Sequence, residues 1–194
     1  MTTFDFGPTA LAADRSRLLS LLIERSYAKK KVVLSSGRES DFYIDCKKTV
    51  LTAEGHWLTG RLLLQQIQQR APGVIGVGGL TMGADPLASA VSLVSHLARA
   101  PLHAFLVRKE PKGHGTGQWV EGLTALPAGS SVAIVEDVVT TGASTIKAIE
   151  RARAEGLNPL GAFTVVDRDE GGREAIAATG VPVFSLFTRG DFPS

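Results

Sequence analysis

Two adjacent carboxylates followed by a hydroxyl-rich loop are the residues of this sequence best suited to binding a sugar phosphate. Glu136 and Asp137 follow the apolar run VAIV at 132–135, and the loop TTGAS at 140–144 comes soon after them. Carboxylates accept strong hydrogen bonds from the hydroxyl groups of a cis-diol. Hydroxyls and backbone N–H groups at the start of a helix favour an anion. A ribose 5-phosphate would satisfy both halves; the competing interpretation is that the acids cap the loop and helix.

A second segment, RKEPKGHGTGQ at 108–118, combines three cations and a histidine with three glycines. Glycine-rich chain is conformationally permissive, so the sequence predicts a flexible loop here. Cations on a loop that closes over a polyanion would exclude water and stabilise a departing group such as diphosphate. A solvated surface hairpin with ordinary charges is the alternative.

Composition limits the classes of protein to which this chain can belong. Hydrophobic residues make up 44% of the 194 residues, enough for a sizeable core, and the formal net charge is only +2. Both signs of charge are spread along the chain, so nucleic acid is not the expected partner. Cys46 is the single cysteine, which excludes an internal disulfide and suits a reducing compartment. We find no signal-peptide pattern and no apolar run of membrane-spanning length, and we expect a cytoplasmic protein without a membrane partner.

Two common nucleotide-binding motifs are absent from the sequence. No G-x-x-x-x-G-K-[ST] motif occurs, and GVGGLT at 76–81 lacks the third glycine of the dinucleotide fingerprint. The histidines His56, His96 and His103 show no metal-ligand spacing, so we expect them to be structural or at the surface.

Short apolar runs alternate with amphipathic segments over most of the chain. This pattern is typical of an α/β protein with a mostly parallel sheet and helices on both faces. Strands are expected at 74–79, 102–107, 132–137, 160–168 and 181–187, and helices at 54–70, 84–99 and 143–155. Ligands of such sheets bind at the carboxyl ends of the strands, where the acid pair and the basic loop stand.

The N-terminal part follows a different pattern. The stretch 11–27 has leucines at helical spacing, and 32–44 indicates an antiparallel hairpin with a turn at 35–40. We expect a single domain over 1–194, in which 1–50 contribute a small hood and 51–194 form the core.

The segments VEDVVTTGAST and RKEPKGHGTGQWVEG together resemble those of the type I phosphoribosyltransferases. The basic loop and the hairpin SSGRESDFY resemble the members that act on orotate in particular. The resemblance implies the type I phosphoribosyltransferase fold, a central mostly parallel sheet flanked by helices with an N-terminal hood. It implies transfer of a 5-phosphoribosyl group from phosphoribosyl diphosphate to orotate, which gives orotidine 5'-phosphate and diphosphate in pyrimidine biosynthesis. It also implies Mg²⁺, held mainly by substrate oxygens, with no protein ligand assigned.

The resemblance assigns roles to individual residues. It implies that Lys112, His114 and Asp137 are catalytic. The residues implied to bind phosphoribosyl diphosphate are Thr81, Met82, Arg108, Lys109, Lys112, His114, Glu136, Asp137, Val138, Val139, Thr140, Thr141, Gly142, Ala143 and Ser144. The residues implied to bind orotate, or expected to line its site, are Arg38, Phe42, Tyr43, Ile44, Thr140 and Arg168.

Arg168 would pair with the orotate carboxylate, because a guanidinium group matches a planar carboxylate. The alternative is a local salt bridge with Asp167 or Asp169. The resemblance further implies a homodimer, in which Lys112 and His114 reach into the neighbouring subunit's site.

Two positions depart from the pattern of many members, which carry lysine where this chain has Ser35 and Met82. Two cations expected near the substrate are therefore missing. Two other functions remain as alternatives. A purine phosphoribosyltransferase would share the central motif but not the basic loop or Arg168. A non-catalytic regulator that senses phosphoribosyl diphosphate would need a basic face or a recognition helix.

Overall fold

Six strands form one central sheet in the computed structural model, which describes residues 7–33, 39–111 and 117–193. The strand order is β5-β4-β3-β6-β7-β8, and each neighbouring pair is parallel except β5 with β4. The strands span Gly76–Leu80 (β3), His103–Val107 (β4), Val120–Glu121 (β5), Ser131–Val139 (β6), Asn158–Asp167 (β7) and Val183–Thr188 (β8). The predicted α/β fold with a mostly parallel sheet is confirmed, and β6, which carries the acid pair, lies between β3 and β7.

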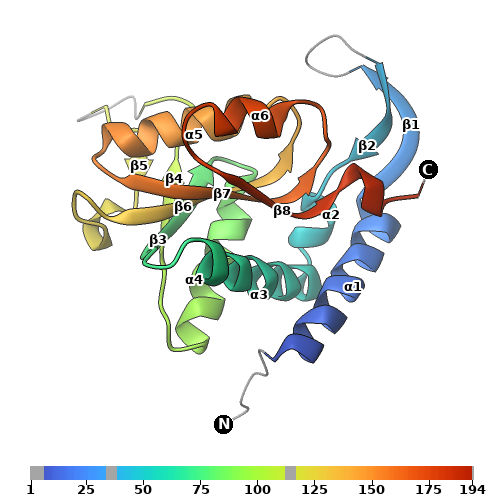
Figure 1. The fold of residues 1–194 in the computed structure, drawn as a ribbon, viewed down its shortest axis with the longest axis horizontal. Coiled ribbons are helices and arrows are strands. Elements are labelled where there is room, and N and C mark those ends of the chain that lie inside the picture. The colour runs from blue at the N-terminus through green and yellow to red at the C-terminus, as the bar shows by residue number, and fades with distance from the viewer. Residues whose placement is uncertain (1–6, 34–38, 112–116, 194) are drawn as a thin grey trace.

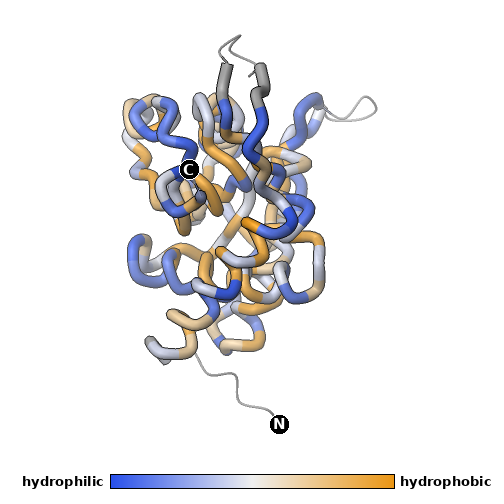
Figure 2. The backbone as a smooth tube through the Cα atoms, turned by 90° about the vertical axis from the view of Figure 1, so that its right-hand side faces the viewer, coloured by the Kyte–Doolittle hydropathy of each residue, from blue (hydrophilic) through white to orange (hydrophobic). Residues whose placement is uncertain are grey.

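Helices cover both faces of this sheet (Figure 1). One face carries α3 and α4, which pack together, with α1 against α3; the other face carries α5 and α6. The helices span Pro8–Arg25 (α1), Lys47–Val50 (α2), Ala53–Arg70 (α3), Ala84–Leu97 (α4), Ala143–Ala154 (α5) and Gly172–Ala177 (α6). Apolar segments run through the interior between these layers (Figure 2). Within the described ranges, no helix is long and apolar enough to cross a membrane.

The side chains of β6 alternate between the two apolar clusters of the core. Val132 and Ile134 belong to the cluster under α5, whereas Ala133 and Val135 belong to the cluster that includes α1, α3 and α4. Successive side chains of a strand point to opposite faces of a sheet. Glu136 and Asp137 continue this alternation at the end of the strand, so the two acids leave β6 in different directions.

The predicted hairpin is present, with β1 (Tyr27–Val33) antiparallel to β2 (Glu39–Ile44). The helix predicted over 11–27 has its C-terminal end in the wrong place. The observed helix α1 ends at Arg25, and Tyr27 begins β1 opposite Ile44. The Tyr27 ring packs against aromatic rings from β2 and the C-terminal segment, and this packing prevails over the helical spacing. Ser35 and Arg38 lie outside the described residues.

Among the α-helices and β-strands, three short elements were not predicted. They are α2, α6 and the edge strand β5, which together contain few residues and show no periodicity that a sequence pattern could reveal. The strand β6 also continues two residues beyond the predicted end at Asp137, to Val139. This extension carries the backbone past the acid pair to the start of the hydroxyl-rich loop.

Candidate functional site

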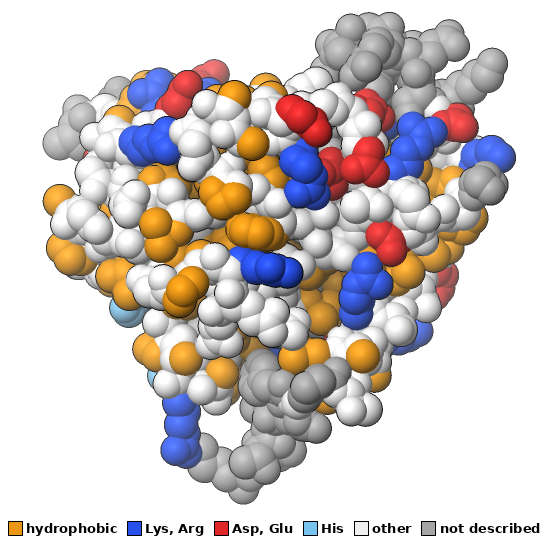
Figure 3. Space-filling view, in the orientation of Figure 1, with side chains coloured by type: hydrophobic (Ala, Val, Ile, Leu, Met, Phe, Trp, Pro, Cys, Tyr) orange, Lys and Arg blue, Asp and Glu red, His pale blue; other side chains and the backbone are white. Residues whose placement is uncertain are grey.

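The acid pair lies near the middle of the sheet, at the carboxyl end of β6. Glu136 and Asp137 are 6% and 8% exposed. A buried carboxylate is costly unless hydrogen bonds or an opposite charge compensate it. In Figure 3, acidic and basic side chains gather on the face between the core and the hairpin.

Glu136 is directed toward the first turn of α5. Its Oε2 accepts hydrogen bonds from the hydroxyls of Ser144 (2.5 Å) and Thr145 (3.4 Å). Burial away from water is the main cause that raises the pKa of Glu136 to about 8; the Ser144 hydroxyl opposes the rise and the Asp137 charge adds to it. Glu136 therefore contacts the start of α5, as the competing interpretation expects, but through side-chain hydroxyls and not through the backbone N–H groups that a helix cap would satisfy.

Asp137 has a different environment, because a lysine from a distant part of the chain reaches it. Lys47 Nζ lies 3.3 Å from Asp137 Oδ2 and 2.9 Å from Asp45 Oδ1. Partial burial disfavours the Lys47 charge, but the hydrogen bond to Asp45 and the charge of Asp137 outweigh it and raise the pKa of Lys47 to about 12. Asp137 is thus the member of the pair that is held beside a cation.

Lys47 was not among the site residues predicted from the sequence. Its signal was available, since DCKK at 45–48 directly follows the second hairpin strand. The rule that ligands bind at the carboxyl ends of parallel strands does not cover the strands of an antiparallel hairpin. Lys47 brings a cation to the site from the hood, in a chain that has Ser35 and Met82 where many members carry lysine.

The turn after β3 lies directly against both acids. A Cβ atom placed on Gly83 would be 2.7 Å from Asp137 Oδ1 and 3.0 Å from Glu136 Oε1, so the turn leaves no room for a side chain there. Thr81 is fixed by its N–H, which donates to the Val107 carbonyl (2.8 Å). The Thr81–Met82 peptide is cis, and the Met82 side chain is 68% exposed. The backbone of this predicted site segment therefore borders the acid pair.

The hydroxyl-rich loop 140–144 is shaped by its contact with α6. Gly142 adopts φ = 81° at the N-terminus of α5, in the left-handed region that favours glycine. A Cβ atom there would be 2.8 Å from the Gly172 carbonyl oxygen, and one on Gly172 would be 2.6 Å from the Thr140 carbonyl oxygen. The glycine pair Gly171-Gly172 thus allows α6 to support the loop, a role that the sequence analysis did not assign.

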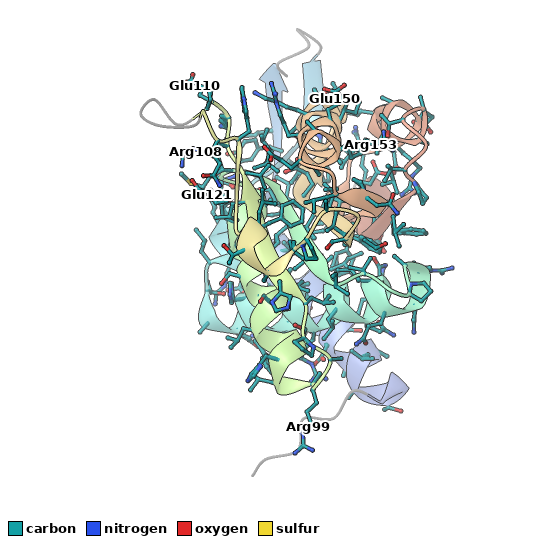
Figure 4. The ribbon with its side chains drawn as sticks, turned by 90° about the vertical axis from the view of Figure 1, so that its left-hand side faces the viewer. Arg99, Arg108, Glu110, Glu121, Glu150 and Arg153 are labelled. Carbon is teal, nitrogen blue, oxygen red and sulfur yellow. The ribbon has the colours of Figure 1, made fainter. Side chains whose placement is uncertain are left out.

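The described part of the basic loop begins at the sheet edge. Arg108 Nη1 lies 3.1 Å from Glu121 Oε1, and Figure 4 shows the two side chains next to each other with Glu110 beyond them. The Lys109 carbonyl accepts a hydrogen bond from Lys147 Nζ of α5 (2.8 Å). The Arg108 side chain is thus paired with Glu121 in this state. The predicted catalytic residues Lys112 and His114 lie outside the described residues.

On the exit side of the same loop, Trp119 contacts α5. The Arg151 guanidinium lies 3.5 Å from the centroid of the Trp119 ring. With the Lys147 contact at Lys109, α5 therefore holds both chain ends that lead into the loop. The helix that begins at the hydroxyl-rich loop also anchors the basic loop.

Arg168 lies at the carboxyl end of β7, next to the acid-pair strand. Its backbone N–H donates to the Val139 carbonyl (3.0 Å), which brings Arg168 close to Thr140. Its Nη2 donates to the Phe42 carbonyl of the hairpin (2.7 Å) and lies 3.1 Å from Glu170 Oε1. Arg168 therefore has a local ion pair, but with Glu170 and not with Asp167 or Asp169 as the alternative interpretation expected.

The neighbouring carboxylates named in that alternative make other contacts. Asp167 lies 2.9 Å from Arg173 Nη2, and it accepts a hydrogen bond from the Asp169 backbone N–H. Tyr43 is half-buried, with Lys30 Nζ 3.9 Å from its ring centroid, whereas Ile44 is buried in the core cluster shared with α1 and α3. The Ile44 side chain, which the sequence predicted to line the orotate site, thus packs in the core.

In the part of the chain that the structure describes, no group of three or more His, Cys, Asp or Glu side chains is arranged to hold a metal ion. The carboxylate oxygens of Glu136 and Asp137 that border Gly83 are hard ligands of the kind that Mg²⁺ accepts. Two such groups fit an ion that takes most of its ligands from a bound substrate.

Comparison with known proteins assigns this arrangement to a family. A model described as the phosphoribosyl transferase domain matches residues 62–183. The orotate phosphoribosyltransferase of Sorangium cellulosum is 54% identical over 93% of this chain and 94% of its own length. That of Thermosynechococcus vestitus is 46% identical over 94% of each chain.

Solved structures agree with this assignment. The Mycobacterium tuberculosis orotate phosphoribosyltransferase in complex with 5-phospho-α-D-ribosyl 1-diphosphate has a TM-score of 0.74 and 36% identity, covering 92% of this chain and 98% of that chain. The Leishmania donovani adenine phosphoribosyltransferase shares the fold at a TM-score of 0.63 and 16% identity, covering 91% of this chain and 82% of that chain. The acid pair, the hydroxyl-rich loop and Arg168 thus stand in a chain that belongs to the orotate phosphoribosyltransferase family.

Proposed function

We propose that this chain transfers the 5-phosphoribosyl group of phosphoribosyl diphosphate to a ring nitrogen of orotate, giving orotidine 5'-phosphate and diphosphate. One observation carries the proposal: Arg168 follows β7 beside the end of β6, where its backbone N–H donates to the carbonyl of Val139, the residue before Thr140 (3.0 Å). A cation for a carboxylate acceptor therefore adjoins the site for a ribose phosphate. The relatives named orotate phosphoribosyltransferase support the choice of acceptor.

The ribose 5-phosphate end of the substrate would lie over β6 and α5. Asp137, with Glu136 beside it, would accept hydrogen bonds from the ribose hydroxyls. The loop 140–144 would hold the 5-phosphate with its backbone N–H groups and hydroxyls at the N-terminus of α5. The Ser144 hydroxyl, which donates to Glu136 at 2.5 Å, would couple the two subsites.

The reaction breaks the bond between the anomeric carbon and the diphosphate oxygen and forms a bond to the orotate nitrogen, which loses its proton. Positive charge develops on the ribose ring as diphosphate leaves, and the Asp137 carboxylate would stabilise that charge. Arg108, Lys109, Lys112 and His114 would contact the leaving diphosphate, with Lys112 or His114 as proton donor. Bound Mg²⁺ would neutralise charge on the diphosphate oxygens, and Glu136 and Asp137 are the described groups that fit it.

We further propose a homodimer in which Lys112 and His114 act in the partner's site. Apolar side chains exposed on and near α4 support a protein contact there, with Leu51, Leu93 and Leu97 exposed by 67%, 57% and 43%. Mixing Lys112→Ala chains with Asp137→Asn chains tests this arrangement. Recovery of activity in the mixed dimers is expected, and no recovery would rule out action in trans. A cytoplasmic location stays a prediction from the single cysteine.

A turnover assay with phosphoribosyl diphosphate, Mg²⁺ and a panel of orotate, uracil, hypoxanthine and adenine tests the function. Formation of orotidine 5'-phosphate from orotate alone is expected. Reaction with adenine or hypoxanthine but not orotate would identify a purine phosphoribosyltransferase instead. Binding of phosphoribosyl diphosphate without turnover of any acceptor would favour the regulator.

A further inference from the structure

The C-terminal segment 188–193 packs against the base of the hairpin, as Figure 1 shows beside the start of β1. Three aromatic rings form the contact. The ring centroids of Tyr27 and Phe42 are 5.2 Å apart, those of Tyr27 and Phe192 are 5.6 Å apart, and those of Phe42 and Phe192 are 5.3 Å apart, edge to face. The Tyr27 hydroxyl donates to the Pro193 carbonyl at 2.8 Å. Phe192 is 7% exposed, so the cluster is a buried contact.

The same segment is held from its other side, so it is a fixed support for the hairpin. Asp191 accepts hydrogen bonds from the Thr188 backbone N–H (2.8 Å) and hydroxyl (3.3 Å), which closes the turn. Arg15 of α1 lies 3.2 Å from Asp191 and donates to the Leu186 carbonyl at 3.0 Å. The turn is thereby joined to α1 and β8.

Phe42 connects this support to the acceptor end of the site. Its ring contacts Phe192, and its carbonyl accepts the 2.7 Å hydrogen bond from Arg168 Nη2. The Arg168 and Arg189 guanidinium groups lie 5.5 and 5.6 Å from the Phe42 ring centroid, and Arg189 also pairs with Asp41. A displacement of Phe42 would therefore move a carbonyl and a ring that both define the direction of the Arg168 guanidinium.

The geometry points to Phe192 as a positioning residue for the acceptor subsite, acting through Phe42 on Arg168. The inference rests on the proposed function, in which Arg168 holds the orotate carboxylate. A planar ion pair depends on the orientation of the guanidinium, so a small shift of Phe42 should weaken orotate binding. The ribose-phosphate end is anchored separately, by the contacts of loop 140–144 with α5 and α6. The two substrates should respond differently to a change at Phe192.

Steady-state kinetics of Phe192→Ala with both substrates varied tests this inference. We expect the KM for orotate to rise at least about fivefold while the KM for phosphoribosyl diphosphate stays within about twofold. Phe192→Tyr keeps the ring and should retain the wild-type KM for orotate. Phe184→Ala is the matched control, because Phe184 also belongs to an aromatic pair: it stacks on Phe163 in the central sheet, with ring centroids 5.2 Å apart. This variant should not change either KM selectively.

Equal changes in both KM values, or an unchanged KM for orotate in folded Phe192→Ala, would overturn the inference. If Phe192→Ala does not fold, Tyr27→Phe removes only the hydrogen bond to Pro193 and should raise the KM for orotate by a smaller factor, whereas an unchanged value would contradict the inference. Arg168→Lys, measured in parallel, separates the two proposals. A raised KM for orotate in Arg168→Lys with no effect at Phe192 would refute the positioning role alone, and a wild-type enzyme inactive with orotate would refute the proposed function.

Discussion

The ribose-phosphate end and the acceptor end of the site are built in different ways. Glu136, Asp137 and the loop 140–144 come from one continuous strand, loop and helix, and Ser144 bonds to Glu136 only eight residues away. The acceptor end combines Arg168 of β7 with Phe42 of the hairpin, 126 residues apart in sequence, and with the C-terminal segment. The first subsite is therefore local and the second depends on tertiary packing, so substitutions in each should affect different substrates.

Replacing Asp137 should have the largest effect on catalysis. The effect should arise at the ribose-phosphate end of the site and leave orotate binding almost unchanged. Asp137→Asn keeps the shape but removes the charge beside Lys47. Loss of one electrostatic contact to a transition state costs about 100-fold to 1,000-fold in kcat. Initial-rate kinetics at saturating orotate measure this loss, and a KM for orotate within about twofold of wild type is expected. A large rise in the KM for orotate would show that the two ends are not independent.

Gly142→Ala should be next, because it disturbs the local end through its backbone. Gly142 has φ = 81° and no space for a Cβ atom beside the Gly172 carbonyl. Strain and overlap together should lower the free energy of unfolding by about 3 kcal/mol, measured by urea denaturation. Gly180→Ala is the control, since Gly180 has φ = 82° with no neighbour within 4 Å. Gly180→Ala should lower the free energy of unfolding by only about 1 kcal/mol, because the left-handed backbone conformation is its only source of strain. Equal losses would mean that α6 does not constrain the loop.

Glu136→Gln should change how the stability of the ligand-free protein depends on pH. Because the folded pKa of Glu136 is raised from 4.5 to about 8, the folded state keeps a proton that the unfolded chain releases between these values. The wild-type free energy of unfolding should therefore fall as pH rises from 4.5 to 8, and the variant should not show this fall. Denaturation at several pH values measures the difference, which should vanish below pH 4.5. Exposed Glu150, replaced by Gln, provides the control. If the free energies of unfolding of Glu136→Gln and wild type changed in parallel with pH, the raised pKa of Glu136 would be contradicted.

Lys47→Gln should have the smallest effect of the four, and it sharpens the comparison because Lys47 belongs to the hood but contacts the ribose end. Removing a cation 3.3 Å from Asp137 should lower kcat/KM for phosphoribosyl diphosphate about tenfold, with Lys47→Arg retaining most of it. Lys48→Gln, at the exposed next residue, should match wild type. A change in the KM for orotate alone would show that Lys47 acts at the acceptor end of the site.

The same distinction explains what could be predicted from the sequence. The strand, acid pair, loop and helix at 132–155 were predicted because their order is local and periodic. The predicted C-terminal end of α1 was wrong, because aromatic rings from β2 and the C-terminal segment place Tyr27 in β1. The contacts of Lys47 with Asp137 and of Arg168 with Phe42 join residues 90 and 126 positions apart, and no local pattern encodes such distances. The roles of Lys112 and His114 stay predictions.

The alternation along β6 also limits how the length of this chain can change during evolution. Val132 and Ile134 face α5 while Ala133 and Val135 face the other helices, and the acids continue that order. Inserting or deleting one residue within the strand would exchange the faces, directing Glu136 toward Lys47 and Asp137 toward α5. Length changes should therefore be tolerated in the exposed turn 127–129 before the strand, whereas β6 itself can vary only by substitution.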